Sequence, residues 1–335
     1  MGVVGFSMKK KEVFEPFPMI QHSWAQTVIG SYFNFDRVPA SKTEHVILPD
    51  GDIIAIEVTT PPNWKETDLT VVFLHGLCGS HKSAYLVRMT NKVYHQGIRS
   101  IRVNMRGCGS GKGLAKNFYH CGSSYDILHV LKYLKDKHSA SPILLIGFSL
   151  GGHIVLKLSG ELEGDARKYV EQVYAVSPPV KLVSSMRLFC HPNNRLFSEY
   201  FTKLLVENIK FLHKSFPELE PFEFPEDVTI WDFDELFVAP RIGYKSAFEY
   251  YQKCSSLPLL PKISIPCKIL FSLDDPIIDS NDVEEVPLPD NIEIYKTDRG
   301  GHLGFIGMPG KTYGFRWMDS LLMTWIKNYK KSREQ

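Results

Sequence analysis

The chain lacks the features that mark several large classes of protein. In its 335 residues, no apolar run reaches the ~18 to 20 residues that a membrane-spanning helix requires. The formal net charge is only +2, so charge favours neither nucleic acid nor an anionic membrane as a partner. Low-complexity tracts and internal repeats are absent as well. The composition is that of a soluble globular protein, with 44% hydrophobic and 23% charged residues.

Cysteine and histidine are present but are not grouped. No two of the six cysteines form a C-x-x-C pair, and the 12 histidines form no H-x-x-x-H or H-E-x-x-H array. Scattered cysteines suit free thiols in a reducing cytosol, and a metal site needs clustered ligands. We therefore expect a cytoplasmic protein with no metal and no cofactor.

We expect no secretion signal in the N-terminal region. Acidic residues and prolines follow the lysines at 9–11, where a signal peptide needs an uninterrupted apolar stretch. Gly2 begins a partial myristoylation motif, but Phe6 stands where that motif needs Ser or Thr. Residues 1–40 show no periodic pattern, so we expect an irregular segment there, followed by a single domain over residues 41–335.

Short apolar runs alternate with helix-like stretches over most of the remaining chain. Glu44 to Leu48 and Ile53 to Val58 flank a turn and alternate apolar with polar residues, which predicts a β-hairpin. Further strands are predicted at 69–74, 100–104, 142–148, 172–176, 267–272 and 291–296, and helices at 84–95, 123–136, 152–163 and 313–329. This order predicts a mostly parallel central sheet flanked by helices on both faces.

The stretch from about 179 to 261 interrupts this alternation. It is helical in pattern and rich in aromatic residues, and it contains no clear pair of strands. We interpret it as a helical cap insertion that lies over one end of the sheet.

One segment combines a strand, a sharp turn and a helix around a serine. The strand predicted at 142–148 leads into Gly147-Phe148-Ser149-Leu150-Gly151, a G-x-S-x-G pattern, and an apolar-periodic helix follows. Glycines at such a turn leave room for a strained backbone that exposes the Ser149 hydroxyl. A phosphate-binding turn is the alternative, but the lysine of a P-loop and a G-x-G-x-x-G pattern are missing. We interpret Ser149 as a nucleophile, with the Leu150 amide directed at a developing oxyanion.

A second turn rich in glycine follows the strand predicted at 69–74. His75-Gly76-Leu77-Cys78-Gly79 has the H-G-x-x-G form that supplies the other oxyanion-hole donor, which we assign to the Leu77 amide. We interpret His75 as a structural hydrogen-bonding residue and not as a catalytic one.

An acid and a base are expected beyond Ser149, because an α/β-hydrolase triad runs in the order Ser, Asp or Glu, His. The strand after the cap ends in Asp274 and Asp275; we choose Asp275 as the orienting carboxylate and keep Asp274 as the alternative. The following strand leads to a glycine-flanked loop that can carry the imidazole of His302 to the serine hydroxyl. The predicted triad is Ser149, Asp275 and His302.

Together these motifs resemble the YheT-like branch of the α/β-hydrolase superfamily, also called the AB hydrolase 4 family. The resemblance spans roughly residues 44 to 325 and rests on His75-Gly76-Leu77, Arg106-Gly107-Cys108, Tyr119-His120, Gly122, Asp126, Gly147 to Gly152, Asp234, Gly243-Tyr244, Glu249-Tyr250-Tyr251, Ser255, Ile263, Pro266 and Asp274-Asp275-Pro276. The chain departs from the branch at Lys268, where an aliphatic residue is usual. Eukaryotic relatives carry an N-terminal membrane anchor, and this sequence shows no apolar run of that length. We therefore expect it to be more similar to the soluble prokaryotic members.

The resemblance implies an α/β-hydrolase fold that hydrolyses acyl esters or acylglycerol-like lipids. Our leading hypothesis is a serine carboxylester hydrolase that forms an acyl-enzyme on Ser149, with the cap shaping an acyl pocket. Acyl transfer to an alcohol, or thioesterase activity, would use the same triad and stays open. A catalytically silent binding protein would have a degraded triad, whereas all three residues are present. The expected partner is a small acyl ester or lipid; the oligomeric state is not predicted.

Overall fold

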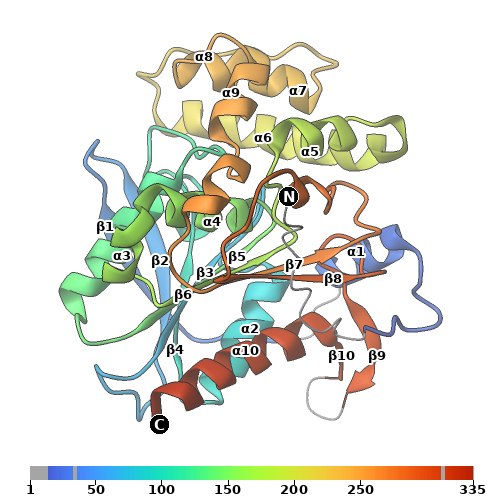
Figure 1. Ribbon diagram of the computed structural model, residues 1–335. Coiled ribbons are helices and arrows are strands. Elements are labelled where there is room, and N and C mark those ends of the chain that lie inside the picture. The colour runs from blue at the N-terminus through green and yellow to red at the C-terminus, as the bar shows by residue number, and fades with distance from the viewer. Residues whose placement is uncertain (1–13, 33–35, 311–313, 335) are drawn as a thin grey trace, which may run out of the picture.

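A computed structural model describes residues 14–32, 36–310 and 314–334 of the protein (Figure 1). Its centre is an eight-stranded sheet with the strand order β1-β2-β4-β3-β5-β6-β7-β8. The strands are β1 (Lys42–Ile47), β2 (Ile53–Thr59), β3 (Thr70–Leu74), β4 (Arg99–Val103), β5 (Ile143–Phe148), β6 (Gln172–Val176), β7 (Cys267–Ser272) and β8 (Ile292–Thr297). Strand β2 pairs antiparallel with β1 and β4, and the pairs from β4 through β8 are parallel. The predicted mostly parallel sheet is confirmed.

Helices cover both faces of this sheet, which explains why its strands are apolar along their whole length. The flanking helices are α2 (Ala84–Tyr94), α3 (Ser124–Lys137), α4 (Leu150–Leu162) and α10 (Trp317–Glu334). In β3, Val71 and Phe73 belong to the core cluster formed with α2 and α10, while Val72 and Leu74 belong to the cluster formed with α3 and α4. Figure 1 shows α2 and α10 on one side of the sheet and α3 and α4 on the other. Both faces of each central strand are therefore buried, as in other doubly covered parallel sheets.

The unusual Lys268 has a local explanation. It lies on β7 directly opposite Glu293 of β8, and its ammonium group donates to the Glu293 carboxylate at 2.9 Å. The same group lies 5.8 Å from the centre of the Trp325 ring on α10. An ion pair across the two strands thus takes the place of an aliphatic contact near the edge of the sheet.

The helical insertion predicted between β6 and β7 is present. It contains α5 (Leu182–Phe189), α6 (Arg195–Ser215), α7 (Ile230–Phe233), α8 (Ala239–Arg241) and α9 (Ala247–Cys254), which gather over one end of the sheet (Figure 1). Many of its aromatic side chains pack on one another: the rings of Phe224 and Phe233 stack at 5.1 Å, and Phe237 is buried with them. Part of the aromatic content therefore forms the core of the cap.

The prediction that residues 1–40 are irregular is wrong for Ser23–Tyr32, which forms helix α1. A ten-residue helix is marginally stable by itself, so its formation here depends on what it packs against. Glu15 and Phe17 also form backbone hydrogen bonds with the chain near Ile306. Gly2 and the lysines at 9–11 lie outside the described residues.

The C-terminal prediction is also partly wrong. The last helix begins at Trp317, and the residues before it form a small antiparallel pair, β9 (Ile306–Gly310) with β10 (Gly314–Arg316). Gly314 has a φ of 58°, which a continuing helix does not allow. Tyr313, where the helix was predicted to start, lies outside the described residues. Within the described ranges, no helix combines the length and apolar character needed to cross a membrane.

Candidate active site

Ser149 occupies a strained turn between β5 and α4. Its φ is 53° and its ψ is −122°, a backbone region that L-residues rarely adopt. The surrounding glycines are required by close backbone approach: a Cβ on Gly147 would lie 2.2 Å from the Gly151 carbonyl oxygen, and one on Gly151 would lie 2.5 Å from that of His75. This packing forces the serine side chain out of the turn and into an adjoining cavity.

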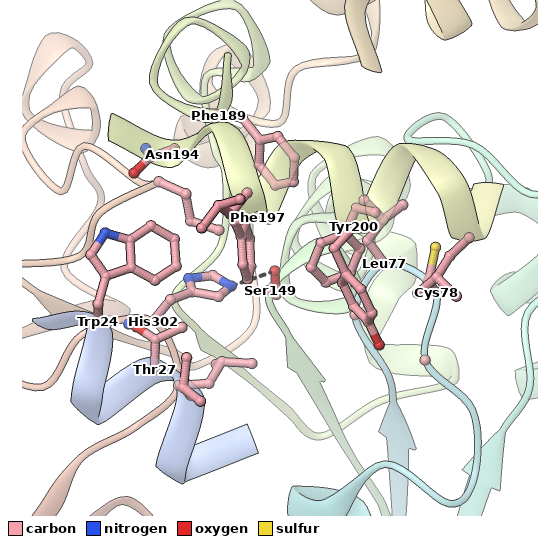
Figure 2. Close-up of a pocket in the computed structure, with 18 of the residues that line it drawn as sticks. Trp24, Thr27, Leu77, Cys78, Ser149, Phe189, Asn194, Phe197, Tyr200 and His302 are labelled. Carbon is pink, nitrogen blue, oxygen red and sulfur yellow. Dashed lines mark hydrogen bonds between the residues drawn. The ribbon is translucent and has the colours of Figure 1, made fainter. Parts of the chain in front are cut away.

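A chain of hydrogen bonds runs from Ser149 through His302 to Asp275. The Ser149 Oγ lies 2.8 Å from His302 Nε2 (Figure 2), and His302 Nδ1 lies 2.8 Å from Asp275 Oδ2. The second oxygen of Asp275 accepts the backbone N–H groups of Ile277 and Ile278 at 3.0 and 3.1 Å. The structure thus brings together all three residues of the predicted triad, from the ends of strands far apart in the sequence.

Asp274, the alternative carboxylate, lies beside the same loop but does not contact the imidazole. Its Oδ1 accepts the backbone N–H of Gly301 at 2.8 Å and the hydroxyl of Ser272 at 2.5 Å. The carboxylate therefore braces the loop immediately before His302. Of the two adjacent carboxylates, that of Asp275 is the one bonded to the imidazole, as predicted for an orienting carboxylate.

The two predicted oxyanion-hole amides lie next to Ser149. Leu150 is the first residue of α4, where N–H groups have no intrahelical partner. The Leu77 loop passes close to the nucleophile: a Cβ added to Gly76 would lie only 3.1 Å from Ser149 Cβ. Within the described part of the chain, neither the Leu77 nor the Leu150 N–H has a hydrogen-bond partner. Both amides are free to bind a charge that develops on a substrate oxygen.

Two tyrosines bind the amides on either side of Leu77, and sequence reasoning missed this role for both. The Gly76 N–H donates to the hydroxyl of Tyr85 at 2.9 Å, and the Cys78 N–H donates to the hydroxyl of Tyr119 at 2.8 Å. Of these three consecutive amides, that of Leu77 has no hydrogen-bond partner among the described residues, as the predicted oxyanion role requires. Tyr119 belongs to the family pattern, but nothing in its spacing indicates this contact.

His75 has the structural role predicted for it. Its Nδ1 lies 2.7 Å from the Gly76 carbonyl oxygen, and its Nε2 accepts the Met105 N–H at 3.1 Å. Complete burial lowers the pKa of His75 to about 4, so the imidazole is neutral at physiological pH. The residue thus links the Leu77 loop to the chain that follows β4.

Cys78 brings a thiol to the same cavity as Ser149. Burial raises the pKa of its thiol to about 12, so the thiol stays protonated at neutral pH. A protonated thiol is a poor nucleophile, whereas the Ser149 hydroxyl is bonded to a base. The six cysteines, all among the described residues, are unpaired thiols.

Ser149 lines two cavities. The larger has a volume of about 820 Å³ and opens between α1, the Leu77 loop and α6; the smaller, of about 100 Å³, extends beneath the cap. Apolar side chains dominate the larger cavity, including Trp24, Phe189, Phe197 and Tyr200 (Figure 2). Such walls suit an acyl chain, and the two spaces can receive the two sides of an ester bond.

Comparison with known proteins identifies the family and the fold. Residues 70–308 match the family model described as alpha/beta hydrolase fold. YheT of Escherichia coli K12, which is named as a candidate esterase, is 28% identical and aligns over 96% of this chain and 94% of its own. Human phospholipase ABHD3 is 26% identical, over 88% of this chain and 74% of its own.

A solved structure, that of an esterase from Pyrococcus furiosus, superposes with a TM-score of 0.56 at 17% identity. The superposition covers 86% of this chain and 92% of the esterase chain, and it supports the fold alone. The chain belongs to the alpha/beta hydrolase fold family. The similarity to YheT over nearly the whole of both chains agrees with the resemblance to the YheT-like branch.

Proposed function

We propose that this carboxylic ester hydrolase cleaves acyl esters or acylglycerol-like lipids through an acyl-enzyme on Ser149. The observation that carries the proposal is the continuous hydrogen-bond chain of Ser149, His302 and Asp275 beside an apolar cavity. The human relative named as a phospholipase adds support for a lipid ester. A pocket with mostly apolar walls and a few polar groups at one point fits such a substrate.

The first half of the reaction transfers the acyl group to the enzyme. Ser149 Oγ attacks the carbonyl carbon while its proton passes to His302 Nε2, and Asp275 stabilises the imidazolium through Nδ1–H. The carbonyl oxygen, now an anion, accepts the N–H groups of Leu77 and Leu150. The bond to the alcohol then breaks, and the leaving oxygen takes the proton from Nε2.

The second half releases the acid. Water attacks the acyl carbon and gives a proton to His302 Nε2, and the same two amides bind the second oxyanion. When the bond to Ser149 Oγ breaks, the carboxylic acid leaves and the serine regains its proton. The proton transfers use Ser149, His302 and Asp275, which are joined by two hydrogen bonds of 2.8 Å.

The test combines covalent labelling with a panel of esters. Purified wild-type protein should react with a fluorophosphonate probe at Ser149 and should hydrolyse p-nitrophenyl esters of graded chain length. Ser149→Ala should lose both properties while it stays folded, with turnover lower by about 10⁴-fold or more. A folded wild-type protein that neither reacts with the probe nor hydrolyses any ester of the panel would overturn the proposal.

Acyl transfer to an alcohol, the alternative left open by the sequence, differs only in the molecule that attacks the acyl-enzyme. The same assay separates the two reactions when ethanol is added and both free acid and ethyl ester are quantified. Free acid as the main product supports hydrolysis, and ethyl ester as the main product supports transfer. A thioester in the panel tests the remaining alternative in the same way.

A further inference from the structure

The loop that carries His302 has an unfavourable backbone. Two residues just after His302 have positive φ angles, 62° at Leu303 and 42° at Phe305. This left-handed region is one that residues other than glycine avoid. Such a conformation persists only where the surroundings hold it in place. The position of the imidazole therefore depends on the elements that pack on residues 300–306.

One of these elements is helix α1, and its Thr27 side chain holds His302 directly. The His302 backbone N–H donates to Thr27 Oγ1 at 2.9 Å, and the same hydroxyl donates to the Ser23 carbonyl oxygen at 2.8 Å. Thr27 is only 2% exposed, although it also lines the edge of the larger cavity. Figure 2 shows Thr27 on α1 beside His302, whose imidazole is hydrogen-bonded to Ser149.

The neighbouring residue, Gln26, holds the far end of the loop. Its Oε1 accepts the Ile306 N–H at 2.6 Å, and its Nε2 donates to the Ile306 carbonyl oxygen at 2.9 Å. This paired contact is fully buried. Two consecutive side chains of α1 thus bind the loop, one at His302 and the other at Ile306.

Glycines on the loop let the helix come this close. A Cβ on Gly301 would lie 2.3 Å from the Ser23 carbonyl oxygen, and one on Gly304 would lie 2.4 Å from that of Gln26. The glycines around His302 therefore serve the seating of α1 as well as the turn itself. No larger residue fits there without moving the helix or the loop.

The same helix also reaches the substrate cavity. Trp24 lines that cavity, and its ring lies 5.0 Å from the ring of Phe197 on α6 of the cap. Helix α1 therefore contacts both the cap and the loop of the general base, although it precedes residues 70–308 that match the family model.

We propose that α1 is part of the catalytic apparatus and that Thr27 is a positioning residue, which fixes the imidazole of His302 for proton transfer from Ser149. This inference rests on the proposed function, in which His302 is the general base. Because proton transfer depends on sub-ångström placement, loss of the Thr27 acceptor should slow the chemical steps and leave substrate binding nearly intact.

The test is steady-state hydrolysis of a p-nitrophenyl ester, together with the rate of fluorophosphonate labelling. Thr27→Val keeps the shape of the side chain but leaves the His302 N–H without an acceptor. We expect kcat and the labelling rate to fall about 10- to 100-fold, while KM changes by less than about 2-fold. Thr27→Ser restores the acceptor and should recover activity to within about 3-fold of wild type.

Thr202→Val is the matched control. Thr202 is also buried and also donates to the carbonyl oxygen four residues earlier, Ser198, at 2.9 Å, but it lies in α6 away from His302. The kcat of Thr202→Val should stay within about 2-fold of wild type. Gln26→Met is a second variant on α1, which removes both bonds to Ile306 and should also lower kcat more than it raises KM.

The outcomes separate the two proposals. An active wild type in which Thr27→Val keeps its kcat, or changes only KM, would overturn the positioning role and leave the proposed function standing. Equal losses in Thr27→Val and Thr27→Ser would overturn it as well, because the hydroxyl acceptor would not matter. If Thr27→Val does not fold, an unchanged kcat in folded Gln26→Met overturns the role of α1. A folded wild type that neither labels nor hydrolyses esters overturns the proposed function itself.

Discussion

Asp274 and Asp275 are adjacent in the sequence, yet their carboxylates bind different parts of one loop. Asp275 accepts His302 Nδ1–H at 2.8 Å, whereas Asp274 accepts the Gly301 N–H at 2.8 Å. The first contact orients the imidazole ring, and the second holds the backbone that carries it.

This division predicts unequal effects of two matched substitutions. Asp275→Asn should lower kcat/KM by about 10⁴-fold, because an amide in that position favours the wrong tautomer of His302. Asp274→Asn keeps an oxygen that can accept the Gly301 N–H, so its loss should be about 10-fold or less. Steady-state kinetics on one ester measure both. Comparable losses in the two variants would contradict the assignment of Asp275.

The tyrosines around Leu77 give a second prediction. In the Leu77 loop, Tyr85→Phe leaves the Gly76 N–H without its acceptor, and Tyr119→Phe does the same to the Cys78 N–H. We expect each substitution to lower kcat about 10-fold, because the Leu77 amide is then less well placed for the oxyanion. Tyr133→Phe, which removes a hydroxyl bonded to Glu44 far from the loop, is the control and should leave kcat unchanged. A full-rate Tyr85→Phe/Tyr119→Phe double variant would show that these contacts do not position the donor.

Replacing His75 should mainly lower stability, whereas replacing His302 should mainly lower activity. His302→Ala should lower ester turnover by about 10⁴-fold or more with little effect on stability. His75→Ala leaves the Met105 N–H unpaired in a buried site, which should cost about 1 to 3 kcal/mol of unfolding free energy. Its loss of activity should be smaller than that of His302→Ala. Urea unfolding and initial rates check the two halves, and a His75→Ala variant that is stable but inactive would refute the structural assignment.

Acid should weaken the fold through buried neutral histidines. Burial lowers the pKa of both His75 and His153 to about 4 from the ordinary value of 6.5. As the pH falls, the unfolded chain protonates these histidines before the folded protein does. Their contribution to the unfolding free energy is therefore fully present above pH 6.5 and is lost as the pH falls towards 4. Each residue contributes about 3 kcal/mol to that loss.

His153→Gln tests this dependence, because glutamine does not titrate and its amide can still donate to the Cys121 carbonyl oxygen that His153 Nε2 contacts at 3.2 Å. Between pH 6 and 4.5, the slope of the unfolding free energy against pH should be about 1 kcal/mol per pH unit smaller in the variant than in wild type. Urea unfolding curves at several pH values, referred to pH 8, give the slopes. Identical slopes would mean that His153 does not contribute to the acid sensitivity.

Much of the sheet could be predicted because its strands are buried on both faces. Such strands are short apolar runs rich in β-branched residues, and the bounds of β6 and β7 match the prediction residue for residue. The positions of Ser149 and His302 followed from the same reasoning, since parallel strands deliver their following loops to one edge of the sheet.

Helix α1 and the β9–β10 pair could not be predicted, because their stability comes from tertiary contacts. In α1, Gln26 and Thr27 read as ordinary polar residues; only the folded chain shows that they bind Ile306 and His302, about 280 residues away. The roles of Tyr85 and Tyr119 were missed for the same reason. A hydroxyl that accepts a distant backbone N–H leaves no periodic pattern in the sequence.

The most direct test of the central claim is to trap the acyl-enzyme. Wild-type protein mixed with a p-nitrophenyl ester and quenched in acid within the first turnover should carry one acyl group on the peptide that contains Ser149, identified by mass spectrometry. The adduct should be absent from Ser149→Ala, which should also fail to release p-nitrophenol above background. Ester hydrolysis that proceeds at the wild-type rate in Ser149→Ala, with no acyl group on this peptide in wild type, would contradict the account.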